Sequence, residues 1–100
     1  MTWYAFLAYF FAGGFLVNGI PHFIHGVSGK KFRTPFSKPM TTGKSSPVLN
    51  VIWGMVNFLI GYALVFGVGQ FQFGFSLDAL MLILGSIVMS LVLALIMEHM

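Results

Sequence analysis

Three long apolar runs, separated by two shorter segments, make up most of this chain. The runs cover about residues 3–25, 47–68 and 77–97. Each can cross the bilayer's hydrocarbon core of roughly 30 Å, which takes about 20 helical residues. Lipid offers no hydrogen-bond partners to the backbone, so each span is expected to be a helix. The pattern predicts an all-α integral membrane bundle of three transmembrane helices, forming a single membrane domain over residues 1–100.

Residues at the predicted helix ends support these limits. Ser46 and Pro47 suit the N-cap and the first position of the second helix, because Ser can accept an orphan N–H and Pro has none to leave unpaired. Ser76 is a candidate N-cap for the third helix. Asp78 would then lie close to the positive end of that helix dipole.

The composition is consistent with a surface that faces lipid. Of the 100 residues, 58% are hydrophobic and only 7% are charged, whereas soluble domains carry about 25% charged residues. The formal net charge is +3, but all five Lys and Arg residues lie in the segment 26–46. This concentration is typical of a cytoplasmic loop between two spans and argues against nucleic-acid binding.

The same charge bias predicts the orientation in the membrane. The segment 69–75 contains no Lys or Arg, so it is expected outside, while the basic segment 26–46 is cytoplasmic. The chain would then be a multi-pass protein of the cell (inner) membrane, with its N-terminus outside and its C-terminus in the cytoplasm. Lys30, Lys31 and Arg33 are expected to contact the head groups of anionic lipids.

Polar side chains within the first run form the first part of a candidate site. Asn18, His22 and His25 have i, i+4 and i+7 spacing, which places them on one face of a helix. Polar groups inside a span are costly and usually face another helix or a wet cavity. Pro21 removes a backbone donor and Gly19 eases bending, so the helix is expected to kink there.

The second run carries a matching face of small and polar residues. Asn50, Gly54, Asn57 and Gly61 follow helical spacing, and Asn57 would lie roughly 15 Å into the membrane at 1.5 Å per residue. Two interpretations remain open: close helix packing with Asn hydrogen bonds between helices, or a polar pocket in the cytoplasmic leaflet. The residues predicted to bind a ligand are Asn18, His22, His25, Asn50 and Asn57.

A metal centre is not predicted. The topology brings His22, His25, Glu98 and His99 to the same side of the membrane, and these are residue types that bind zinc. The H-E-x-x-H pattern of helical zinc enzymes is nevertheless absent. Haem would require an oligomer, because two His residues one turn apart cannot ligate opposite faces of one haem.

Small residues on several faces predict association with other proteins. They allow helix backbones to approach closely, and one such face is enough to pack a third helix against two others. The additional faces therefore predict a homo-oligomer or a place in a larger membrane complex. These small residues include Ala5, Ala8, Ala12, Gly54, Gly61, Ser86, Ser90 and Ala94.

The leading functional hypothesis is a binding or accessory subunit whose pocket accepts a lipid or another amphiphile. A membrane enzyme acting on a lipid, with His22 or His25 as general base, is the first alternative. It is less favoured because no carboxylate pairs with a His inside the membrane. A purely structural subunit is the second. A functional His should give binding or activity that titrates near about pH 6–7.

Overall fold

The computed structural model describes residues 3–37 and 43–98, and it is all-helical with three helices. These are α1 (Trp3–Val27), α2 (Pro47–Phe66) and α3 (Leu77–Glu98). Each is long and apolar enough to cross a membrane, which confirms the predicted fold class. Within the described ranges there is no strand, and a single antiparallel bridge joins Phe32 to Ser45.

The end of α1 lies two residues beyond the predicted residue 25, because Gly29 supplies a C-terminal cap. Gly29 has a φ of 72°, a left-handed conformation that Gly adopts without steric cost. Its N–H donates to the Gly26 carbonyl oxygen at 3.0 Å, and the Lys30 N–H donates to that of His25 at 2.9 Å. This pair of bonds is a Schellman motif, and it turns the chain back toward α2.

The ends of α2 are set by short-range hydrogen bonds. Ser46 Oγ accepts the Leu49 N–H at 3.1 Å, as the N-cap prediction requires. At the other end Gly67 is the C-cap, with its N–H donating to the Ala63 carbonyl oxygen at 2.7 Å, and α2 ends at Phe66 and not at the predicted residue 68.

The start of α3 is also capped as predicted, with Ser76 Oγ accepting the Ala79 N–H at 3.1 Å. The helix continues to Glu98, one residue past the predicted end.

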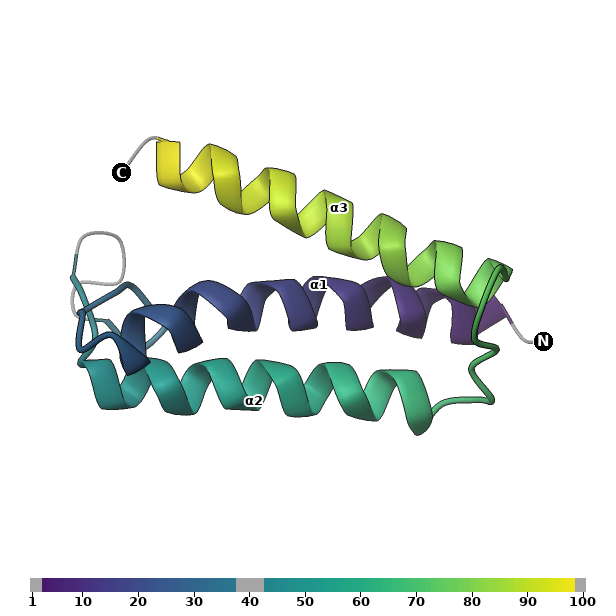
Figure 1. Cartoon of the computed structure of the whole chain (residues 1–100), viewed down its shortest axis with the longest axis horizontal. Helices are drawn as coiled ribbons and strands as arrows, with labels where there is room; N and C mark the ends of the chain where they lie inside the picture. The colour runs from purple at the N-terminus through teal and green to yellow at the C-terminus, as the bar shows by residue number, and fades with distance from the viewer. Residues whose placement is uncertain (1–2, 38–42, 99–100) are drawn as a thin grey trace.

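The three helices are arranged with α1 in the middle (Figure 1). Helix α1 packs against both α2 and α3, whereas no contacts join α2 to α3 in the described part of the chain. Figure 1 shows α3 close to α1 near the N-terminal end of both helices and diverging from it toward the C-terminus. The molecule measures 42 × 24 × 21 Å, and its long axis matches the roughly 40–45 Å of a bilayer with its head groups.

The contact between α1 and α2 follows a seven-residue spacing of small residues on α1. Ala5, Ala12, Gly19 and Gly26 are all buried. A Cβ atom added at Gly19 would lie 2.8 Å from the Gly54 carbonyl oxygen, and one at Gly26 would lie 2.7 Å from that of Pro47. The two backbones therefore approach closely, as small residues allow in membrane helices. The predicted face of α2 is buried in this contact and comprises Asn50, Gly54, Asn57 and Gly61.

The contact between α1 and α3 is short and depends on two glycines. A Cβ atom at Gly85 would overlap the Phe10 carbonyl group, and one at Gly13 would overlap the Leu82 carbonyl oxygen and lie 2.7 Å from Ser86 Oγ. Gly85 was not among the predicted small-residue positions. Of the predicted row on α3, Ser86 lies at this contact, whereas Ser90 and Ala94 are exposed.

Candidate functional site

The segment after α1 folds onto the end of the helix pair through hydroxyl groups. The Phe32 and Ser45 backbones exchange hydrogen bonds of 3.2 and 2.8 Å. Ser45 Oγ lies 2.6 Å from Thr34 Oγ1 and 2.9 Å from Ser37 Oγ, and all three side chains are buried. Residues 32–37 therefore form a defined cover over the ends of α1 and α2.

Asn50 connects this cover to both helices. Its side chain is 0% exposed, and its amide nitrogen donates to the carbonyl oxygens of Phe32 at 3.0 Å, Ser45 at 3.2 Å and Ser46 at 3.0 Å. Carbonyl oxygens accept hydrogen bonds but cannot donate, so these contacts determine the orientation of the amide. The Asn50 Oδ1 atom must therefore face α1.

The orientation of Asn50 determines which ring nitrogen of His22 carries hydrogen. His22 Nδ1 lies 3.0 Å from Asn50 Oδ1. An amide oxygen can only accept, so His22 Nδ1 must be the donor of this hydrogen bond. The hydrogen is thus on Nδ1, and Nε2 of the neutral ring is an acceptor. His22 also borders a cavity, and Nε2 is the ring nitrogen that the bond to Asn50 leaves unused.

His25 has a different environment from that of His22. Its Nδ1 lies 2.7 Å from the Pro21 carbonyl oxygen, and its ring stacks on Phe32 with centroids 4.1 Å apart and an interplanar angle of 11°. Phe32 also contacts the His22 ring, with centroids 5.3 Å apart. His25 therefore supports the ring of Phe32, which in turn borders the cavity.

A second pair of amides lies deeper between α1 and α2. Asn57 is 0% exposed; its nitrogen donates to the Trp53 carbonyl oxygen at 2.8 Å, and its Oδ1 accepts from the Asn18 nitrogen at 3.0 Å. Because the Asn18 nitrogen faces Asn57, the Asn18 Oδ1 atom is left to accept a hydrogen bond from another group. Asn18 is half-buried and borders the same cavity as His22.

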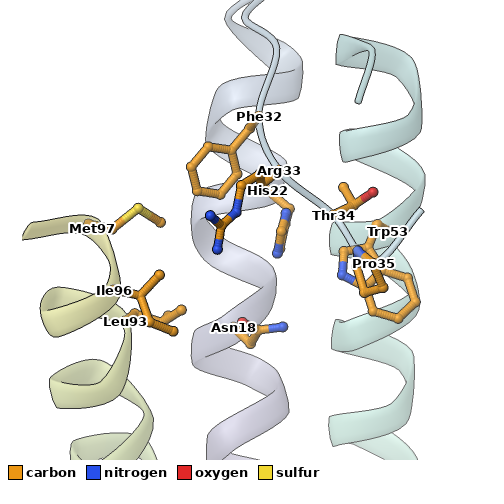
Figure 2. A pocket seen from close by; sticks show the side chains of 10 residues that line it. All are labelled: Asn18, His22, Phe32, Arg33, Thr34, Pro35, Trp53, Leu93, Ile96 and Met97. Atoms are coloured by element: carbon orange, nitrogen blue, oxygen red, sulfur yellow. The ribbon is translucent and has the colours of Figure 1, made fainter. Parts of the chain in front are cut away.

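The cavity has a volume of about 260 Å³ and lies across α1, between the cover, α2 and α3. Figure 2 shows Leu93, Ile96 and Met97 of α3 on one side and Trp53 of α2 on the other. The Arg33 side chain extends from the cover past His22, on the side of α1 that faces α3. One cationic group and two polar residues of α1 are thus combined with apolar walls.

Only part of the predicted site lies on this cavity. Asn18 and His22 line it, as does Arg33, which the sequence predicted to contact a lipid head group. Asn50 and Asn57 are behind the wall and hydrogen-bonded within the protein. Lys30 and Lys31 are exposed and do not line the cavity, and neither does His25.

Several lining residues were not identified from the sequence. Trp53 is one turn before Asn57 along α2, and its spacing from Asn50 and Asn57 could have placed it beside the polar face. The three α3 residues are ordinary apolar residues of a span, and only the path of α3 relative to α1 brings them here. The residues missed were Phe32, Thr34, Pro35, Trp53, Leu93, Ile96 and Met97.

The His and Glu residues considered as zinc ligands do not gather in the described part of the chain. Over residues 3–37 and 43–98, no group of three His, Asp or Glu side chains is placed to hold an ion. His99, considered above with His22, His25 and Glu98, lies outside these residues.

Comparison with protein-family models, curated proteins and solved structures finds no match to this chain. Function must therefore be argued from the site itself. The three apolar helices fit a small multi-pass membrane protein, and the polar cavity near the C-terminal end of α1 is the candidate site considered below.

Proposed function

We propose that this protein binds the head group of an anionic amphiphile in the cavity of α1, as a binding or accessory protein of the membrane. The observation that carries the proposal is the combination of Arg33, His22 and Asn18 with apolar walls in one cavity. Arg33 is the only Lys or Arg among the lining residues and the only group there with a permanent charge, which favours a negatively charged head group.

The polar atoms of the cavity also favour a hydroxyl-bearing ligand. His22 Nδ1 donates to Asn50 and the Asn18 nitrogen donates to Asn57. The remaining polar atoms of these two side chains, His22 Nε2 and Asn18 Oδ1, are hydrogen-bond acceptors. A hydroxyl group can donate to either atom while a phosphate accepts from the Arg33 guanidinium. The chemistry therefore matches a phospholipid whose head group carries free hydroxyls.

The size of the cavity limits what it can enclose. About 260 Å³ is slightly below the roughly 300–1,000 Å³ of typical small-molecule sites, so it accommodates a head group but not a whole lipid. Acyl chains would lie outside, along the apolar side chains of α1 and α3. The lack of contact between α2 and α3 in the described residues leaves this side of α1 accessible to lipid.

The test compares retention of two lipids by the purified protein. We expect native mass spectrometry after exchange into mild detergent to show phosphatidylglycerol bound in preference to phosphatidylcholine. Arg33→Gln should lower phosphatidylglycerol retention about tenfold, as loss of a charged hydrogen bond implies. Lys30→Gln is the matched control, because it removes the same charge from an exposed position outside the cavity, and its retention should change less than twofold. An equal loss in both variants would instead indicate general attraction to a basic loop.

A place in a larger assembly is part of the same proposal. Helices α2 and α3 each expose large apolar side chains along their length, including Leu59, Tyr62, Leu91 and Leu95. Such faces can contact either lipid or the helices of another subunit. The small-residue contacts within the chain use Gly13, Gly19 and Gly85, so a partner would pack on other surfaces.

A further inference from the structure

Two buried side chains, each with an oxygen that has no hydrogen-bond partner among the described residues, lie at the opposite end of the molecule from the cavity. Tyr9 of α1 is 0% exposed and Asp78 of α3 is 1% exposed. Neither Tyr9 Oη nor Asp78 Oδ1 has a hydrogen-bond partner among the described residues. Buried polar atoms are almost always paired with protein groups or ordered water, so both atoms have unused capacity for a hydrogen bond or a bound ion.

The connection between α2 and α3 encloses this position. The Gln72 N–H donates to Asp78 Oδ2 at 2.8 Å, and the Phe71 ring packs edge-on against Tyr9 with centroids 5.0 Å apart. A Cβ atom at Gly69 would lie 3.1 Å from Tyr9 Oη. The connection therefore covers the Tyr9 ring, is attached to one oxygen of Asp78 and leaves the other oxygen without a partner.

The charge of Asp78 is not balanced by a basic side chain. All five Lys and Arg residues lie between positions 30 and 44 of the sequence. The four that the structure describes, Lys30, Lys31, Arg33 and Lys44, belong to the segment between α1 and α2, at the other end of the molecule (Figure 1). Asp78 lies in the first turn of α3, where the positive end of the helix dipole offsets only part of its charge. An ionised carboxylate out of water is costly without a full compensating charge.

We propose that Tyr9 Oη and Asp78 Oδ1 are ligands of a hard cation, such as Na⁺ or Ca²⁺, bound beneath the connection between α2 and α3. Hard cations prefer oxygen ligands, and both available atoms are oxygens. The ion supplies the positive charge that the side chains of this end lack. It also links α1 to α3 close to the glycine contact and thereby stabilises the fold.

The test follows thermal unfolding of the full chain in detergent by circular dichroism. NaCl, or CaCl₂ in a separate series, replaces N-methyl-D-glucamine chloride at constant ionic strength, so screening does not change. We expect the melting temperature to rise with the logarithm of the ion concentration above its dissociation constant. Asp78→Asn should abolish the rise, whereas Glu98→Gln, which removes an exposed carboxylate from the other end of α3, should preserve it.

A second variant tests the proposed cation site if Asp78→Asn does not fold. Tyr9→Phe removes one ligand oxygen and should raise the ion concentration needed for half of the effect roughly tenfold. Tyr62→Phe, at an exposed position on α2, is its matched control and should leave that concentration unchanged. The proposal is overturned if the melting temperature does not respond to Na⁺ or Ca²⁺, which is the result expected if a water molecule occupies the site. It is also overturned if Asp78→Asn or Tyr9→Phe responds to the ion as the unmodified protein does.

Discussion

His22 both takes part in the hydrogen-bond network between α1 and α2 and lines the cavity. Its Nδ1 is bonded to Asn50, which is bonded in turn to the cover over the helix ends. The side chain thus has a structural bond on one ring nitrogen and the cavity for the other. Structural and binding roles are therefore not exclusive here, although the sequence presented them as alternatives.

Replacing His22 with Phe separates these two roles. The variant retains an aromatic ring but leaves Asn50 Oδ1 without a donor, so we expect the free energy of unfolding to fall by about 1–3 kcal/mol in an SDS titration. The folded fraction should retain at least tenfold less phosphatidylglycerol by native mass spectrometry, since Nε2 is lost from the cavity.

The matched variants for His22→Phe are His25→Phe and Asn57→Leu. His25→Phe keeps a ring against Phe32 and should bind nearly as well as the unmodified protein. Asn57→Leu removes a hydrogen bond between the helices, should lower stability by about 0.6–2 kcal/mol, and should leave binding by the folded protein largely intact. If His22→Phe binds normally, the cavity is not a binding site and the residue acts only in packing.

At the scale of the helices, α1 makes two different contacts. Its contact with α2 extends over most of its length through residues spaced by seven, and it includes the two Asn-mediated hydrogen-bond networks. Its contact with α3 depends on Gly13 and Gly85, where the two backbones nearly touch. The direction of α3, and with it the apolar wall of the cavity, depends on this second contact.

Adding a methyl group at Gly85 tests this dependence. A Cβ atom there would overlap the Phe10 backbone, so Gly85→Ala should lower the free energy of unfolding by about 1–3 kcal/mol in an SDS titration, as overpacking does. Gly14→Ala is the matched control, because its Cβ would lie an ordinary 3.8 Å from the Met89 side chain. An Ala within a helix is otherwise favoured over Gly by roughly 1 kcal/mol. Equal or increased stability in Gly85→Ala would contradict the close contact.

At the scale of the whole molecule, the basic segment and the C-terminal end of α3 lie together, while the connection between α2 and α3 lies at the other end (Figure 1). The described Lys and Arg residues, Lys30, Lys31, Arg33 and Lys44, belong to the first of these ends. The proposed head-group cavity and the proposed cation site are therefore at opposite ends of the molecule. From the positive-inside rule we predict that the cavity lies in the cytoplasmic leaflet and the proposed cation site on the outer side.

Reporter fusions test this orientation. Fusions at residue 40 and at the C-terminus should report from the cytoplasm, and a fusion at residue 72 should report from outside, because the bias in Lys and Arg is complete. Replacing all five basic residues with Gln provides the comparison, since it removes the bias and should produce mixed orientations. An external signal from residue 40 in the unmodified chain would reverse the assignment of both sites.

The sequence by itself determined the three helices and the face of α2 that packs. Hydrophobic length, capping residues and helical spacing are local properties, and lipid permits few other backbone structures. The predicted helix limits therefore lie within two residues of the observed ones. The differences of two residues occur at the ends of α1 and α2, beside Gly29 and Gly67, and depend on detailed backbone geometry.

Only the tertiary structure decided which polar residues reach the cavity. Asn50 and Asn57 have the same spacing whether they face a ligand or another helix, and their burial depends on how close Gly54 and Gly61 bring α1. Lys30 and Arg33 are alike in charge, but the bridge between Phe32 and Ser45 folds Arg33 into the cavity and leaves Lys30 exposed. Such contacts join residues far apart in the chain, and no local pattern encodes them.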